Sequence, residues 1–245
     1  MKQYFLSLCL FLTLLACQTE PTAEFIINKS IEASGGSLYE HSKIKFNFRE
    51  KQYKVERNNG AYSMQRITNK DTLIVSDVLS NDGFARIIND SLTIVSDSMA
   101  DKYSESINSV FYFALLPYRL NDEAVHKKFL GKVSIAEKEY YKIEVSFTEK
   151  GGGIDFQDVY IYWINTENYK IDYLAYSFIV NGGGMRFRKA YNEQIVGGIR
   201  FVDYINYKPT ATINSVHDLD KAFLNNELKE LSRIELKNIK VTTQL

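Results

Sequence analysis

The chain has 245 residues, of which 30 are basic and 30 acidic, so its formal net charge is zero. A nucleic-acid-binding protein neutralises phosphate with a basic surplus or patch, and no run of Lys or Arg here exceeds two residues. Hydrophobic residues make up 45% of the chain, which is typical of a globular domain and too high for a disordered one. We therefore expect a folded domain with no nucleic-acid partner.

The first sixteen residues have the pattern of a bacterial secretory signal. An apolar run follows Lys2 and is too short to span a membrane as a helix. It ends in Leu-Leu-Ala-Cys at residues 14–17, which resembles the lipobox, where bacterial lipoproteins are cleaved and lipid is attached to the cysteine. We predict a signal peptide at 1–16 and a lipidated Cys17 with its tether at 17–23. The alternative is an ordinary signal peptide with an incidental cysteine.

Cysteine usage follows from this interpretation. Cys9 leaves with the signal and Cys17 carries lipid, so the mature domain has no thiol for a disulfide, a metal site or cysteine catalysis. Acyl chains on Cys17 contribute about 0.8 kcal/mol per buried methylene to membrane anchoring. Gln18 follows in place of the Asp that retains some lipoproteins at the inner membrane, which favours an outer-membrane, cell-envelope location.

The segment TAEFIINKSIEASGG predicts one helix near the start of the domain. Thr22 is a suitable N-cap and Gly35 supplies the stop. Phe25, Ile27 and Ile31 are spaced to share one apolar face, so we expect this face to pack on the core.

Strand patterns begin immediately afterwards. Apolar and polar residues alternate over 43–49, which is typical of a strand with one buried face. Asn, Asp and Gly turn residues separate further strand-like runs, which predicts an antiparallel meander. The runs lie at 52–58, 61–68, 72–79, 84–89 and 91–96.

The meander is interrupted by an apolar helix predicted over 107–116 and ended by Pro117. Because this helix is apolar all round, protein or a ligand must cover it. Strands resume over 132–148, and a short helix over 217–228 precedes the last strand. The segments between them, at 151–184, 185–191 and 198–208, are also strand-like.

These elements predict a mainly β (α+β) domain over 24–245 with ten to twelve strands and two or three helices. So many strands do not stay flat, so we expect one large curved antiparallel sheet or a half-open β-barrel, with helices on its concave side.

Residues 151–184 form an aromatic hairpin between two glycine triplets. The triplets lack the Lys-Ser/Thr and the helix of a phosphate loop, so we interpret them as bends or bulges. Both faces of the hairpin are apolar, so its aromatic residues fill a core or line a ligand cavity. With the 107–116 helix, the candidate lining is Phe111, Phe113, Leu115, Tyr162, Trp163, Tyr173 and Tyr176.

Three arginines on neighbouring predicted strands form a second candidate site. Arg186 and Arg188 alternate on one face, and Arg200 lies on the next strand. Such guanidinium groups hold an acidic head group in bidentate fashion. Cross-strand pairing with Glu193 or Asp203 is the alternative, and the pattern favours it.

No catalytic residue, metal site or cofactor is predicted. The three histidines, His41, His126 and His217, lack metal-ligand spacing, and the chain has no nucleophile-elbow motif. Asp155 and Asp158 are the remaining acidic pair, and three residues apart on a strand they face opposite sides.

Together, the lipobox, the helix EFIINKSIEASGG, the long meander and the internal apolar helix resemble the LolA/LolB-like superfamily. That resemblance implies a half-open barrel closed by helices, with an apolar cavity for acyl chains. The segments GGGIDFQDVYIYWIN, IDYLAYSF and GGGMRFRKAYN are similar to a family of uncharacterised lipoproteins of two-membrane bacteria. No residue-level motif of the carriers is present, so no site residue follows from the resemblance.

The leading functional hypothesis is a membrane-anchored lipoprotein that binds a lipid or other apolar ligand without catalysis. A second hypothesis is an interaction module that docks an envelope partner through exposed tyrosines. A third is a hydrolase, which a cleft bringing together Asp155, Asp158, Arg186 and Arg188 would favour.

Overall fold

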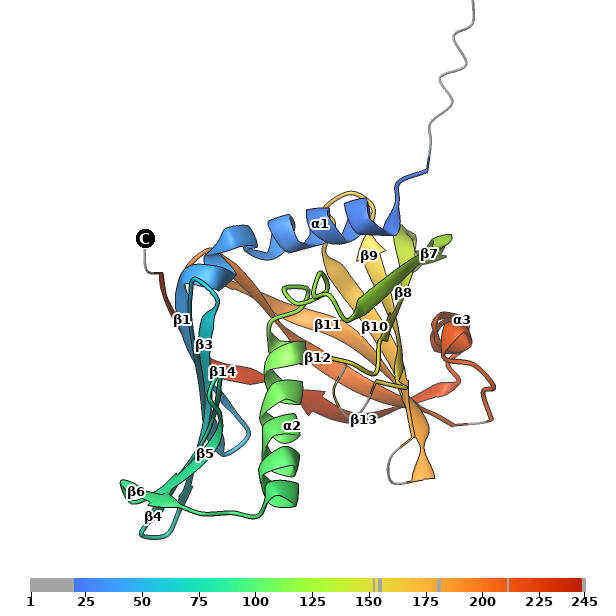
Figure 1. The fold of residues 1–245 in the computed structure, drawn as a ribbon. Coiled ribbons are helices and arrows are strands. Elements are labelled where there is room, and N and C mark those ends of the chain that lie inside the picture. The colour runs from blue at the N-terminus through green and yellow to red at the C-terminus, as the bar shows by residue number, and fades with distance from the viewer. Residues whose placement is uncertain (1–19, 152, 154–155, 180–181, 211, 244–245) are drawn as a thin grey trace, which may run out of the picture.

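The computed structural model describes residues 20–151, 153, 156–179, 182–210 and 212–243. Fourteen strands in this part of the chain form two antiparallel sheets of seven strands each. Figure 1 shows the sheets facing each other across an interior that contains a helix, so the strands do not close into a barrel.

The first sheet is the expected N-terminal meander with the last strand added at its edge. Its order is β14 (Leu236–Thr243), β1 (Ser42–Phe48), β2 (Lys51–Asn58), β3 (Ala61–Lys70), β4 (Leu73–Ser80), β5 (Gly83–Ile88) and β6 (Ser91–Thr93). The second sheet has the order β13 (Leu228–Ile234), β12 (Ile199–Pro209), β11 (Gly184–Val196), β10 (Ile171–Phe178), β9 (Val159–Asn165), β8 (Lys138–Phe147) and β7 (Val125–Ile135). Only Glu235 separates β13 from β14, so the chain passes directly from one sheet to the other.

Two of the three α-helices lie on the concave side. Helix α2 (Asp97–Ala114) stands between the two sheets, and α1 (Ala23–Ser34) crosses one end of the interior (Figure 1). Helix α3 (Leu219–Leu224) lies on the outer face of the second sheet, after the short 3₁₀ helix η3 (Val216–Asp218). A further 3₁₀ helix, η1 (Gly36–His41), leads from α1 into β1.

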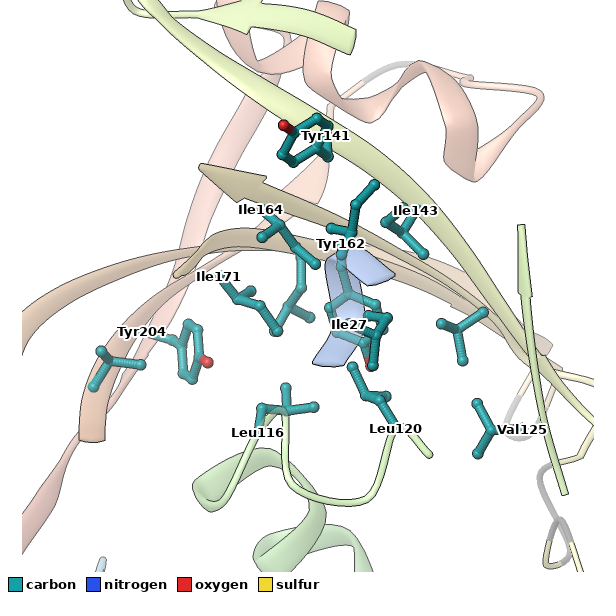
Figure 2. Close-up of a cluster of buried hydrophobic side chains, with 14 residues drawn as sticks. Ile27, Leu116, Leu120, Val125, Tyr141, Ile143, Tyr162, Ile164, Ile171 and Tyr204 are labelled. Carbon is teal, nitrogen blue, oxygen red and sulfur yellow. The ribbon is translucent and has the colours of Figure 1, made fainter. Parts of the chain in front are cut away.

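Three buried clusters hold these layers together. One joins α1 and the segment after α2 to the inner face of the second sheet, where Leu116 and Leu120 face the strand that carries Tyr162 (Figure 2). A second joins α2 to the first sheet, and a third joins η3 and α3 to the outer face of the second sheet. All three clusters come from residues 23–241, so the chain from residue 20 onward retains every described residue of the core.

The mainly β, curved and unclosed architecture predicted from the sequence is confirmed, with the strands divided between two sheets. The ends of α1 are also confirmed. Thr22 Oγ1 accepts a hydrogen bond of 3.1 Å from Phe25 N, and the backbone of Gly35 has φ 146°. The predicted inward orientation of Phe25 is wrong: Ile26 and Ile27 are buried, and Phe25 packs edge-on against Tyr169 at the surface.

Helix α2 begins ten residues before the predicted start at 107 and ends at Ala114, so Leu115 lies just beyond it. Its first turns are rich in Ser, Asp and Lys and contain no apolar run, so the sequence pattern does not indicate that they are helical. These turns gain their partners only in the fold, where Tyr103 stacks on Phe84 and its ring contacts Arg86.

The second glycine triplet makes the bend that the sequence predicts. Gly182, Gly183 and Gly184 all have positive φ values. At Gly184 a Cβ atom would lie 2.9 Å from Cζ of Phe178, so a larger residue would displace that ring. The triplet thus turns the chain from β10 into β11 and lets the Phe178 ring lie against the backbone.

Candidate functional site

A cavity of about 410 Å³ lies between α2 and the inner face of the second sheet. Helix α2 contributes Ser109, Val110, Phe113 and Ala114, the end of β1 contributes Phe48, and the turn after it contributes Arg49. The second sheet, the residue before β9 and β14 contribute Asp158, Tyr160, Tyr176, Phe178, Arg186, Arg188, Val202, Tyr204, Asn206, Ser232, Ile234 and Leu236.

The apolar part of this lining is aromatic. The rings of Tyr160 and Tyr176 stack with centres 5.6 Å apart across β9 and β10. Phe113 of α2 lies 5.5 Å from Tyr176 and 6.3 Å from Tyr160. These three rings therefore form a continuous apolar wall that joins the helix to the sheet.

The charged part of the lining is mainly cationic. Arg186 and Arg188 both line the cavity from β11, and the exposed Arg49 lines it from the turn after β1. Asp158 is the one acidic residue among the described lining residues. Three guanidinium groups against one carboxylate leave an excess of positive charge beside an apolar wall.

Arg188 is the most buried of these arginines, with 8% of its surface exposed. Its Cζ lies 3.9 Å from the centre of the Phe113 ring and 5.1 Å from that of Tyr176. Its Nη2 donates to the hydroxyl of Tyr176 at 2.9 Å, and its Nε is buried without an acceptor. In the described part of the chain, no carboxylate forms an ion pair with Arg188.

Arg200 does not join this group, so the predicted arginine triad is wrong for this residue. Its Nε donates to Glu193 Oε2 at 2.6 Å, and its Nη2 lies 3.8 Å from Asp172 Oδ1. Its Nη1 also donates to the carbonyl of Ile171. The alternative of cross-strand pairing with Glu193 is therefore correct for Arg200, whereas Arg186 and Arg188 face the cavity.

The predicted lining residues of the cavity divide between four environments. Phe113 and Tyr176 line the cavity. Phe111 and Leu115 belong to the cluster between α2 and the first sheet, and Phe111 lies on the opposite side of the helix from Phe113. Tyr162 is buried behind the cavity on the inner face of the second sheet.

Tyr162 is joined to α2 by a buried hydrogen bond. Its hydroxyl lies 2.6 Å from that of Tyr112, which links β9 to the helix beside the cavity. Burial raises the pKa of both hydroxyls, so both are neutral at physiological pH and one donates to the other. The pair holds α2 at a fixed distance from the sheet.

Trp163 and Tyr173 lie on the outer face of the second sheet and do not line the cavity, so the expectation that they line it is wrong. They are covered by η3 and α3, since alternate residues of a strand point to opposite faces. Trp163 Nε1 donates to Asp220 Oδ2 at 3.3 Å, and Lys142 Nζ lies 2.9 Å from the same oxygen. This buried network fixes α3 to the sheet.

A second cavity of about 270 Å³ lies on the other side of the same aromatic wall. It shares Ser109, Phe113 and Tyr160 with the first cavity. The two cavities are therefore adjacent, with Phe113 and Tyr160 between them.

Sequence reasoning missed Tyr160, Phe178 and Arg49 as lining residues. Tyr160 lies two residues before Tyr162, so both side chains point to the inner face of the strand. The period-two pattern of the sequence could therefore have indicated Tyr160. Arg49 lies in a turn with φ 54°, and no pattern in the chain indicates that this turn reaches the cavity.

Three of the four residues named for a hydrolase line the first cavity, namely Asp158, Arg186 and Arg188. Asp155 and Cys17 lie outside the described residues. Within the described ranges, no three His, Cys, Asp or Glu side chains group as metal ligands. No helix in that part of the chain combines the length and hydropathy needed to cross a membrane.

Comparison with known proteins agrees with the fold. A family model matches residues 2–236. The chain belongs to that family, DUF6503, whose function is unknown. A solved LolA superfamily protein from Nitrosomonas europaea is similar to it, with a TM-score of 0.51 and 13% identity over 92% of this chain and 96% of that chain. At this identity the likeness establishes the fold alone, and DUF6503 therefore has a LolA-like fold.

A DUF1329 family protein from Desulfovibrio piger ATCC 29098 is also similar, with a TM-score of 0.43 and 8% identity over 92% of this chain and 95% of that chain. No curated protein matches the chain. The family model confirms the expected membership of an uncharacterised family, and the Nitrosomonas europaea protein confirms its expected LolA-like fold.

Proposed function

We propose that this protein is a lipid-anchored envelope protein whose domain binds the acyl chain of a lipid or a similar apolar ligand without catalysis. The observation that carries the proposal is the 410 Å³ cavity between α2 and the inner face of the second sheet. Its volume falls in the range of about 300–1,000 Å³ typical of small-molecule sites.

The lining suits an acyl chain. Phe113, Tyr160 and Tyr176 form its aromatic wall, and Val110, Val202 and Ile234 add aliphatic surface. Each methylene that moves from water into such a site contributes about 0.8 kcal/mol, so binding energy accumulates along a chain. The LolA-like fold supports the same proposal, since the similar protein from Nitrosomonas europaea belongs to the LolA superfamily.

The anchor and the location rest on the lipobox at residues 14–17. A lipidated Cys17 holds the domain at a membrane surface, and Gln18 favours the outer membrane. The short tether to α1 then keeps the cavity close to the bilayer from which an apolar ligand would come.

Blocking the cavity tests the binding proposal. The chain from Gln18 onward, which retains every described residue of the core, is titrated with the neutral apolar fluorophore N-phenyl-1-naphthylamine. The variant Ser109→Trp places a large ring at the exposed edge of the cavity lining, and we expect it to weaken binding about tenfold or more. Asp101→Trp, on an exposed position of the same helix, is the matched control. Equal binding by both variants and the unaltered chain, or no binding by any, would refute the proposal.

The interaction-module hypothesis loses its basis in the structure. It depends on exposed tyrosines, and every described tyrosine is buried or half-buried. The exposed large apolar side chains are instead aliphatic residues and Phe25.

A hydrolase is the second candidate, because Asp158, Arg186 and Arg188 share one cavity. No His or Cys lies among the described lining residues, so the site lacks the usual partner that activates a nucleophile. Incubation with p-nitrophenyl dodecanoate and p-nitrophenyl phosphate tests this candidate. Turnover that Asp158→Asn abolishes would support it.

A further inference from the structure

We propose that the cavity selects an amphiphile with an anionic oxygen head group, a carboxylate or a phosphate, which Arg188 and Arg186 bind while the apolar part lies against Phe113. This inference rests on the proposed function, because it names the chemical class of the ligand held in the same cavity.

Arg188 carries the argument because it is a buried cation without a counter-ion among the described residues. A buried charge is normally paired, and a guanidinium group has five N–H donors to satisfy. The described residues give Arg188 one hydrogen bond, to the neutral hydroxyl of Tyr176, and leave its Nε without an acceptor. An anion in the cavity would supply the missing charge and acceptors.

Arg186 places a second cation on the same side of β11. Residues two apart on a strand share a face and lie about 7 Å apart. Arg186 stacks on Phe178 at 4.9 Å, and its Nη1 donates to the carbonyl of Met185, so its other donors are available to a ligand. Two guanidinium groups at this spacing fit the oxygens of one carboxylate or phosphate.

The surrounding charges support an anion. Arg49 adds a third guanidinium to the lining, in which Asp158 is the one carboxylate among the described residues. Arg200 provides a contrast within the same sheet, because carboxylates within the fold neutralise it. The described residues therefore pair Arg200 with carboxylates and give Arg188 at the cavity none.

The aromatic contacts fix the direction of the ligand. The Phe113 ring lies against the guanidinium group of Arg188, so polar and apolar surfaces meet at one point of the lining. A head group at Arg188 would leave the chain to run along Phe113 and Val110 of α2, which line the same cavity.

Competition between matched ligands tests the inference. Dodecanoate, dodecyl phosphate and the uncharged 1-dodecanol share one chain and differ in the head group. The measurement is the concentration at which each ligand displaces N-phenyl-1-naphthylamine from the chain that begins at Gln18. We expect at least one of the two anions to displace the probe at a concentration about tenfold or more below that of dodecanol. The anion that does so identifies the head group.

Variants of Arg188 and Arg186 test whether these residues cause the advantage of the anion. We expect Arg188→Met to abolish the advantage of the anion while dodecanol still displaces the probe. Arg233→Met, at an exposed position of β13 that does not line the cavity, should retain the full advantage. Arg186→Met, at a partly exposed position, is the second variant and should reduce the advantage even where Arg188→Met does not fold.

The outcomes separate the two proposals. If the probe binds and all three ligands displace it equally, the head-group inference is wrong and the apolar site stands. An advantage of the anion that survives both Arg188→Met and Arg186→Met also overturns the inference. If the probe does not bind, the proposed function fails and the inference fails with it.

Discussion

The guanidinium carbon of Arg188 lies 3.9 Å from the centre of the Phe113 ring. This contact joins β11 of the second sheet to α2, and both residues line the larger cavity. The ring covers one face of the cation, which attracts it electrostatically but gives it no hydrogen bond. Phe113 therefore contacts Arg188 without supplying the negative charge that no described carboxylate provides either.

The two arginines of the second sheet should differ in their effect on stability. Arg200→Met removes the arginine that pairs with both Glu193 and Asp172, so we expect the free energy of unfolding to fall by about 2–4 kcal/mol. Arg188→Met removes a buried cation that has no ion-pair partner among the described residues, so the free energy without ligand should change by less than about 1 kcal/mol or rise. Urea denaturation of both variants measures this, and an equal loss would contradict it.

The carboxylate of Asp77 should stabilise the first sheet in a pH-dependent way. It lies 2.7 Å from both Arg66 Nη2 and Arg86 Nε, and Arg66 also donates to Ser106 of α2. Burial acts to raise the pKa of Asp77, but the hydrogen bonds and charges of Arg86 and Arg66 outweigh it and hold the pKa below the ordinary value of 3.8. We expect Asp77→Asn to cost about 3 kcal/mol at pH 7.

The sign of this pH effect follows from the lowered pKa. The folded state binds the proton of Asp77 less readily than the unfolded state, so the contribution is complete above pH 3.8 and is lost as the pH falls through the lower folded pKa. The difference between the unaltered chain and Asp77→Asn should thus be constant near neutral pH and shrink below about pH 4. Asp82→Asn, in an exposed turn, is the control. A difference that persists unchanged at low pH would argue against this account.

The hydroxyl pair of Tyr112 and Tyr162 should be energetically coupled. Removing either hydroxyl leaves the other buried without a partner, so each single change to Phe should cost about 1–2 kcal/mol. The double variant removes both groups and should cost less than the sum of the single variants. Chemical denaturation of all four proteins gives the coupling energy. Tyr207→Phe, whose hydroxyl has no hydrogen-bond partner among the described residues, is the control, and strict additivity would exclude the coupling.

Lipidation at Cys17 is tested directly in cells. We expect Cys17→Ser to abolish incorporation of a labelled fatty acid and to move the protein from the detergent phase to the aqueous phase on Triton X-114 partition. Cys9→Ser changes the other cysteine of the chain and should leave both properties intact. Labelling that persists in Cys17→Ser would disprove the lipobox assignment.

Local chemistry explains which features could be predicted. The Thr22 cap, the glycine stop of α1 and the turn residues between β1 and β6 act within a few residues of each other, so their effects are visible in the chain. The period-two pattern likewise indicated that both faces of the aromatic hairpin need cover. The expectation of an antiparallel, curved β domain rested on such short-range signals.

The residues of the hairpin do not indicate which helices pack against which of its two faces. Tyr162 and Trp163 are adjacent and both fully buried, yet one packs beneath α1 and α2 and the other beneath α3. Apolar character alone cannot separate them, since the covering helices come from distant parts of the chain.

The order of residues alone establishes the lipobox-like motif, the succession of strands and turns and the apolar part of α2, because these depend on residues close together in the chain. Whether each arginine is neutralised depends on the fold, in which Glu193 pairs with Arg200 and no described carboxylate pairs with Arg188 at the cavity. Both arginines lie on strands of similar pattern, and they differ because charge pairing depends on which strands and helices the whole fold brings together.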